Sequence, residues 1–162
     1  MTTANDYGQS ILTRLASGRG LETVKLQKLL YFIQGWSLAS WDKPAFEEEI
    51  QAWKLGPVVP EVYKHHASKA FVGKDSDLGG STDRLSQGEN SLVDFVVANY
   101  GSVGAFDLAD YTHEPNSPWF RATFPEGGQG AVFYAPIPQE DIKRYFLSEA
   151  KRIRNGGAFV PL

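Results

Sequence analysis

The feature that most constrains the fold is a long apolar stretch at residues 22–41 that keeps helical spacing throughout. One stripe at positions i, i+3, i+4 and i+7 consists of Leu26, Leu29, Leu30 and Ile33. Phe32 and Trp36 lie on a neighbouring stripe, so the apolar arc is wide. A helix with so wide an apolar arc belongs in the middle of a bundle, and we expect Lys25 and Lys28 on its polar edge.

Further helices are expected on both sides of this central helix. Helical spacing and capping residues predict helices over residues 5–17, 60–67, 103–111 and 139–154. The last of these has acidic residues in its first turn and basic residues in its last turn, as the helix dipole favours. Residues 71–91 are rich in Gly, Asp and Ser, and this composition predicts a surface loop.

Two short segments have strand patterns. Residues 46–54 alternate loosely until Gly56-Pro57 breaks the pattern, and residues 131–137 follow a Gly-rich turn. We expect these two segments to pair. The predicted fold class is therefore mainly α, a compact helical bundle around the central helix with a small two-stranded β element. Because the 162 residues contain no repeat and no linker, residues 1–162 are expected to form one domain.

Composition excludes several classes of function. The chain has no cysteine, which excludes a disulfide scaffold, a thiolate nucleophile and a Cys-ligated zinc site. Its formal net charge of −3 gives no reason to expect direct binding of nucleic acid. A spanning helix needs ~20 mainly apolar residues, and no such run or signal peptide is visible, so we expect a cytoplasmic protein with no membrane association.

The sequence lacks the common catalytic motifs. The sequence has no nucleophile elbow, phosphate-binding loop or dinucleotide fingerprint, so we expect neither enzymatic activity nor a cofactor. Adjacent His65 and His66 would point ~100° apart on a helix, which disfavours a shared metal ion. We expect both in solvent, no metal site, and His113 ordering a loop through hydrogen bonds. An enzyme that uses His113 with Glu114 is an alternative, and it requires a pocket with converging titratable groups.

The most unusual segment is residues 52–63, AWKLGPVVPEVY, where a bulky strand end meets a Gly-Pro turn and the start of a helix. Trp53 and Tyr63 are expected to pack against this turn. Two interpretations stay open, an architectural corner between sheet and helix or a binding interface. The lysines between residues 54 and 74 form a basic cluster, which is either ordinary surface or a docking surface for an acidic partner.

Five short motifs occur in order along the chain. They are residues 25–32 (KLQKLLYF), Gln34-Gly35-Trp36, residues 52–63, Thr112-His113-Glu114 and Ser117-Pro118-Trp119. Together they resemble the Panacea domain, also called the SocA-like antitoxin family, from about residue 21 to residue 146. The resemblance implies a mostly helical domain of bacterial and prophage genomes. It also implies an antitoxin that neutralises a cognate protein toxin, encoded by an adjacent gene, through direct binding.

The residues and the resemblance both favour a protein that acts by binding another protein. The predicted partner-binding residues are Trp53, Lys54, Pro57, Val58, Tyr63, Lys64, His113 and Trp119. The alternative is a prophage or host interaction protein, or an adaptor, without a toxin partner. The sequence leaves open whether the free protein forms a homo-oligomer.

Overall fold

The structure of the protein is a computed structural model that describes residues 1–127 and 130–161. Its helices are α1 (Ala4–Leu15), α2 (Thr23–Trp41), α3 (Pro60–Tyr63), α4 (Gln87–Tyr100), α5 (Ala105–Thr112), α6 (Pro118–Thr123) and α7 (Gln139–Arg154), with a 3₁₀ turn, η1 (Thr82–Arg84). Its strands are β1 (Leu21–Glu22), β2 (Gln51–Trp53), β3 (Gly56–Val58), β4 (Phe71–Val72) and β5 (Ala135–Pro136). The mainly α fold class predicted from the sequence is confirmed.

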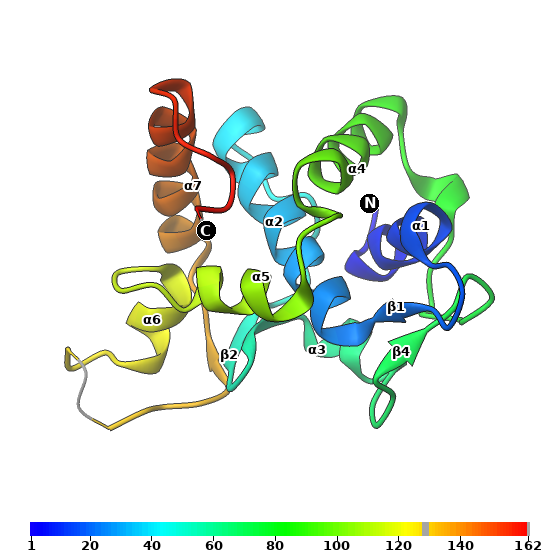
Figure 1. Ribbon diagram of the computed structural model, residues 1–162, viewed down its shortest axis with the longest axis horizontal. Helices are drawn as coiled ribbons and strands as arrows, with labels where there is room; N and C mark the ends of the chain where they lie inside the picture. The colour runs from blue at the N-terminus through cyan, green and yellow to red at the C-terminus, as the bar shows by residue number, and fades with distance from the viewer. Residues whose placement is uncertain (128–129, 162) are drawn as a thin grey trace.

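The predicted central helix is confirmed as α2, which runs through the middle of the molecule (Figure 1). Helix α7 lies on one side of it, and α1 and α4 lie on the other. Both apolar stripes are buried, and the ring of Phe32 stacks on that of Tyr100 with centroids 4.1 Å apart. A Cβ at Gly35 would lie 2.2 Å from the ring of Phe146, so α2 and α7 approach closely only because this residue has no side chain.

The predicted pairing of the two strand segments is also confirmed, although both strands are shorter than expected. β2 pairs antiparallel with β5, with Ala52 opposite Ala135. The first strand ends before Gly56-Pro57, as expected, but Gly56-Pro57 also begins an unpredicted strand, β3, which pairs with β2 in a hairpin. Gly56 has a φ of +114° and follows a two-residue turn, a geometry that suits a tight hairpin. The sheet therefore has three strands, in the order β3-β2-β5.

The segment expected to be a surface loop contains much regular structure. Its first residues form β4, which pairs with β1 in a second, two-stranded sheet, and its last residues begin α4. Between them, Leu78 is fully buried, and its carbonyl accepts a hydrogen bond from Asn5 Nδ2 at 2.7 Å. Ser86 and Glu89 form a capping box that starts α4. Composition did not predict the regular structure of this region, because side chains of α1, which is distant in the sequence, hold its backbone in place.

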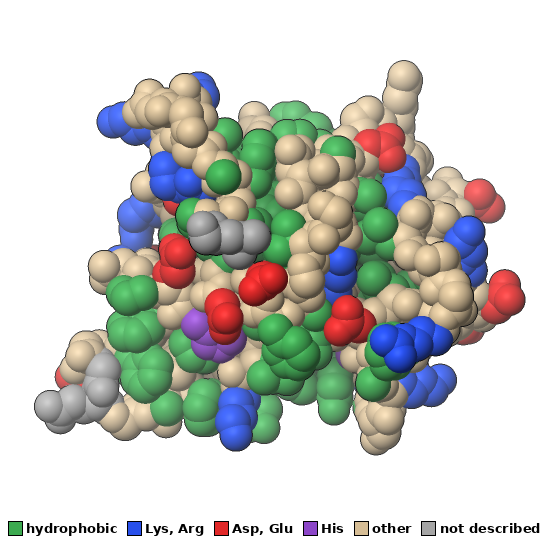
Figure 2. All heavy atoms as spheres, in the orientation of Figure 1, with side chains coloured by type: hydrophobic (Ala, Val, Ile, Leu, Met, Phe, Trp, Pro, Cys, Tyr) green, Lys and Arg blue, Asp and Glu red, His purple; other side chains and the backbone are tan. Residues whose placement is uncertain are grey.

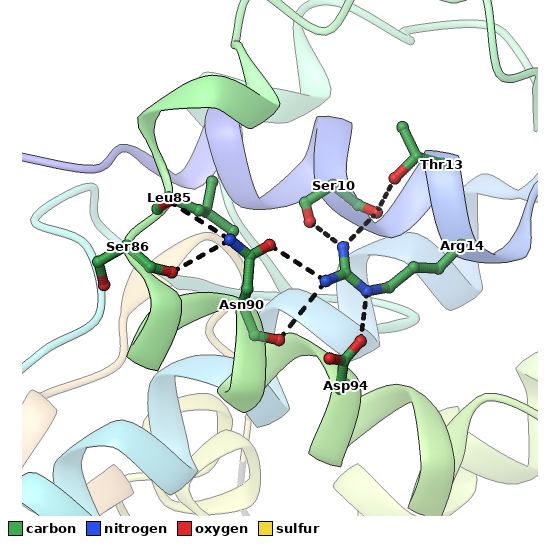
Figure 3. Close-up of polar contacts among 7 residues, drawn as sticks. All are labelled: Ser10, Thr13, Arg14, Leu85, Ser86, Asn90 and Asp94. Carbon is green, nitrogen blue, oxygen red and sulfur yellow. Dashed lines mark hydrogen bonds and ion pairs between the residues drawn. The ribbon is translucent and has the colours of Figure 1, made fainter.

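A polar network fastens α1 to α4 (Figure 3). The guanidinium of Arg14 donates to Asp94 Oδ1 at 2.7 Å and to Asn90 Oδ1 at 3.1 Å. The same guanidinium also reaches Ser10 on its own helix. Asp94 is 68% exposed, so this network lies at the surface of the molecule.

Candidate functional site

A groove of about 330 Å³ opens beside the tip of the β2–β3 hairpin, and we call it the hairpin groove. Its apolar wall consists of Val24, Trp53, Leu55, Val58, Tyr63 and Tyr134. Its polar lining consists of Thr23, Gln27, Lys28, Lys54 and His66. The groove is therefore built by the N-terminal half of α2, the hairpin, α3 and the segment that leads into β5.

The rings of the groove pack around Trp53. Its ring meets the ring of Tyr63 edge-on with centroids 4.6 Å apart. The ring of Tyr134 lies on Trp53 at 5.3 Å in a similar edge arrangement. Leu55 is 48% exposed and Tyr134 is 63% exposed, so the rim of the groove is apolar and open. Contiguous exposed apolar surface of this kind is typical of interaction sites.

Helices α5 and α6 contact the hairpin through the backbone carbonyls of Trp53 and Lys54. Trp119 Nε1 donates to the Trp53 carbonyl at 2.6 Å, and His113 Nε2 lies 3.0 Å from the Lys54 carbonyl. His113 Nδ1 faces the carbonyl of Ala109 within α5. The Lys54 carbonyl belongs to the hairpin turn, so the Nε2 contact is the one that agrees with the prediction that His113 orders a loop by hydrogen bonding. A neutral imidazole carries one N–H, so it donates to only one of these two carbonyls at a time. The His113 ring also packs on Trp119, with centroids 3.9 Å apart.

Helix α2 holds the hairpin from the inside through Lys28. The sequence placed Lys28 on a polar edge, and this was wrong, because the residue is 1% exposed. Its Nζ donates to the Pro57 carbonyl at 3.0 Å, and burial lowers its pKa to about 7. A Cβ at Gly56 would lie 2.6 Å from Lys28 Cε, so this glycine leaves the room that the lysine occupies.

Gln27 makes the second internal link. Its Oε1 accepts from the Val59 N–H at 2.8 Å, so its amide nitrogen faces His66 Nε2 at 2.9 Å. Because an amide nitrogen only donates, His66 Nε2 accepts and Nδ1 carries the proton. That Nδ1 is buried and has no hydrogen-bond partner among the described residues.

The expectation that His65 and His66 are both in solvent was therefore wrong for His66. His65 is exposed, but His66 is 3% exposed, and burial lowers its pKa. The short helix α3 turns His66 inward against the ring of Tyr63, with centroids 5.3 Å apart. Two adjacent histidines thus have opposite environments.

The structure brings most of the predicted partner-binding residues together around the hairpin, in two groups. Trp53, Lys54 and Tyr63 line the groove with part of their surface exposed, whereas Pro57, Val58 and Trp119 are buried and His113 is half-buried. Lys64 lies apart from the groove lining and pairs with Glu61 at 2.7 Å.

Several groove residues were missed by sequence reasoning. Gln27 and Lys28 carried a usable signal, since two adjacent polar residues interrupt the middle of an apolar helix. Leu55 carried a weaker signal as the apolar residue at a hairpin tip. No sequence signal indicated Tyr134, which reaches the groove only through the pairing of β5 with β2.

Two other kinds of arrangement concern residues 1–127 and 130–161, a metal site and a membrane-spanning helix. Within these ranges no group of three or more His, Asp or Glu side chains is placed to hold a metal ion. The same residues contain no single helix that is both long and apolar enough to cross a membrane, although the bent pair α4–α5 meets that test by length and composition. The groove lining offers donors and apolar surface, which suits binding of another molecule.

Comparison with known proteins gives two matches. A family model described as "Antitoxin SocA-like, Panacea domain" matches residues 26–120, a narrower range than the resemblance suggested, and it leaves out β5 and α7. The protein named Antitoxin SocA from Caulobacter vibrioides (strain NA1000 / CB15N) is 30% identical over 109 residues. This alignment covers 61% of the chain and 58% of the Caulobacter protein, so the chain spans less than two thirds of that relative. No solved structure matches the chain.

Proposed function

The chain belongs to the SocA-like antitoxin family with a Panacea domain, and from this premise we propose that it is an antitoxin. In this proposal it neutralises a protein toxin, encoded by an adjacent gene, by binding the toxin directly. Such an action needs no bond to be made or broken by the antitoxin itself. The name of the Caulobacter relative supports the antitoxin role.

The observation that carries this proposal is the exposed apolar rim at the hairpin. Leu55 and Tyr134 are exposed, and Val132 and Phe133, which lead into β5, are also exposed. Figure 2 shows hydrophobic side chains gathered over α6 and around the tip of the hairpin, with a basic side chain among them. Exposed apolar side chains gathered in one place favour a protein–protein contact.

Rigidity of the hairpin also supports a binding role. Its turn is tied to α5 and α6 through backbone carbonyls, and its inner face is tied to Gln27 and Lys28 on α2. A surface that is already ordered loses less conformational entropy when it binds. We therefore assign direct contact to Trp53, Lys54 and Tyr63, and support of the contact surface to Pro57, Val58, His113 and Trp119.

Co-expression with the adjacent gene tests this function. If that gene alone stops growth, the full chain should restore growth and should co-purify with the gene product. Leu55→Asp should abolish both effects, because it places a charge on the apolar rim without touching the core. Leu147→Asp on α7 is the matched control, since Leu147 is 46% exposed and lies outside the groove lining.

Two outcomes would contradict the proposal. A neighbouring gene that is harmless, or harmful but unaffected by the full chain, would remove the antitoxin role and favour an interaction or adaptor protein. Full rescue by Leu55→Asp, with the variant folded, would move the contact surface away from the hairpin.

A further inference from the structure

The hairpin groove is sized for side chains of a protein segment. Its volume of about 330 Å³ is at the lower limit of the ~300–1,000 Å³ usual for small-molecule pockets. Trp53, Tyr63 and Tyr134 supply aromatic surface on its wall. A space of this size and lining suits one large apolar side chain.

The exposed charge in the groove lining is basic. Lys54 is exposed, Lys28 is buried, and the lining includes no Asp or Glu among the described residues. Lys54 is exposed and forms no ion pair with any residue that the structure describes. The chain as a whole carries a net charge of −3, so this basic lining differs from the average surface. It therefore complements a partner segment with carboxylates.

The buried polar groups of the groove lining are committed to the hairpin and to one another. Lys28 Nζ donates to the Pro57 carbonyl. Gln27 has its oxygen occupied by the Val59 N–H and its nitrogen directed at His66. His66 Nδ1 is buried and has no hydrogen-bond partner among the described residues. The charged group that a ligand can reach in this lining is therefore the exposed Lys54 ammonium.

The backbone at Tyr134 adds an independent observation. Tyr134 has a φ of +68°, a conformation that is costly for a bulky residue. Its N–H donates to the Ala52 carbonyl at 2.7 Å, and this link to β2 holds the ring against Trp53. The fold thus keeps a strained, exposed aromatic residue at the mouth of the groove. Such strain is concentrated at functional positions.

We propose that the hairpin groove binds an acidic segment of the partner protein that carries one large apolar side chain. The apolar side chain enters between Trp53, Tyr63 and Tyr134, and carboxylates beside it pair with Lys54. This inference rests on the proposed function, because it names the chemistry of the toxin segment that the antitoxin would cover.

Peptide binding tests the chemistry without the toxin. The probe is a seven-residue peptide with a central Trp flanked by three Asp on each side, titrated into the ¹⁵N-labelled full chain. We expect shifted amide signals at the residues other than proline in the range 53–63 and at Tyr134. Affinity should fall between about 50 mM and about 300 mM NaCl, since salt screens exposed charges. Peptides with the Trp replaced by Ala, or with the Asp residues replaced by Lys, should bind at least roughly fivefold more weakly.

Two variants test the groove residues, and a third serves as the control. Lys54→Glu should lower the affinity for the acidic peptide by roughly fivefold or more. Lys151→Glu makes an equal charge change on α7 and should leave the affinity within about twofold of that of the parent chain. Tyr134→Gly should also weaken binding. Because glycine adopts a positive φ at little cost, this variant should fold at least as well as the parent chain.

Several results would overturn the inference. They are equal binding of the Lys-flanked peptide, shifts that map away from the groove, and no shifts at millimolar peptide. Self-association of the free chain through the same amides would assign the groove to a second copy instead.

The growth assay separates this inference from the proposed function. Full rescue by Lys54→Glu and Tyr134→Gly would overturn the acidic-segment inference and leave the antitoxin role intact. Peptide binding at the groove, without rescue of growth by the parent chain, would overturn the antitoxin role and leave the acidic-segment inference intact.

Discussion

The hairpin and the contact between α1 and α4 both depend on polar side chains from one helix that bind another segment, but their surroundings differ. At the hairpin, Gln27 and Lys28 bind backbone groups in places that water does not reach. Between α1 and α4, Arg14 binds Asp94 and Asn90 at the surface, where water can replace a lost bond. A buried polar group that loses its partner costs far more than an exposed one.

This difference suits the roles that we propose for the two regions. A hairpin held by buried bonds keeps one shape before and after a partner binds, which lowers the cost of association. The α1–α4 network instead joins two helices of the bundle at the surface, away from the residues that line the groove. Three substitutions test this difference, with expected effects that decrease from Gly56→Ala through Lys28→Met to Asp94→Ala.

Gly56→Ala should have the largest effect. The new Cβ would sit at a φ of +114° and 2.6 Å from Lys28 Cε, so backbone strain and overpacking add together. We expect the free energy of unfolding to fall by about 3 kcal/mol, measured by urea denaturation. Gly88→Ala is the matched control, since nothing lies near that position in α4 and the change should stabilise by about 0.5 kcal/mol. Equal stabilities for Gly56→Ala and the parent chain would refute the account of a closely packed hairpin.

Lys28→Met should change the pH dependence of stability. Burial lowers the Lys28 pKa from 10.5 to about 7, so above neutral pH the unfolded chain binds a proton that the folded chain does not. Stability of the parent chain should therefore rise from about pH 7.5 to about pH 9.5, with a slope of up to about 1.4 kcal/mol per pH unit from this residue. Burial also lowers the pKa of Lys25, so the difference between the two chains isolates Lys28. Identical slopes of stability against pH for the parent chain and Lys28→Met would show that Lys28 keeps its proton in the folded state.

Asp94→Ala should have the smallest effect. It removes the ion pair with Arg14, but that pair is exposed at the surface and Arg14 keeps its bond to Asn90. We expect the free energy of unfolding to fall by about 0.5 kcal/mol at low salt and by less in about 1 M NaCl. Thermal unfolding at low salt and in about 1 M NaCl measures both values. A loss as large as that of Gly56→Ala would erase the contrast between the two regions.

Local patterns predicted much of the fold. The spacing of apolar residues identified α2, and the distribution of charges along α7 agrees with its observed bounds from Gln139 to Arg154. The loop-ordering role of His113 was also predicted, since this residue lies in a compact motif. The prediction of a surface loop from composition failed where a helix distant in the sequence holds the segment in place. An example is Leu78, whose carbonyl accepts a hydrogen bond from Asn5 of α1.

A bundle around α2 and the pairing of β2 with β5 followed from local patterns, because periodicity and strand pattern are properties of neighbouring residues. Burial of Lys28, the inward position of His66 beside an exposed His65, and the place of Tyr134 in the groove depended on long-range packing. These outcomes depend on which surfaces cover each side chain once the chain has folded. The missing side chain of Gly56 is an example, since it lets the hairpin close over a lysine that the helical pattern alone would place in water.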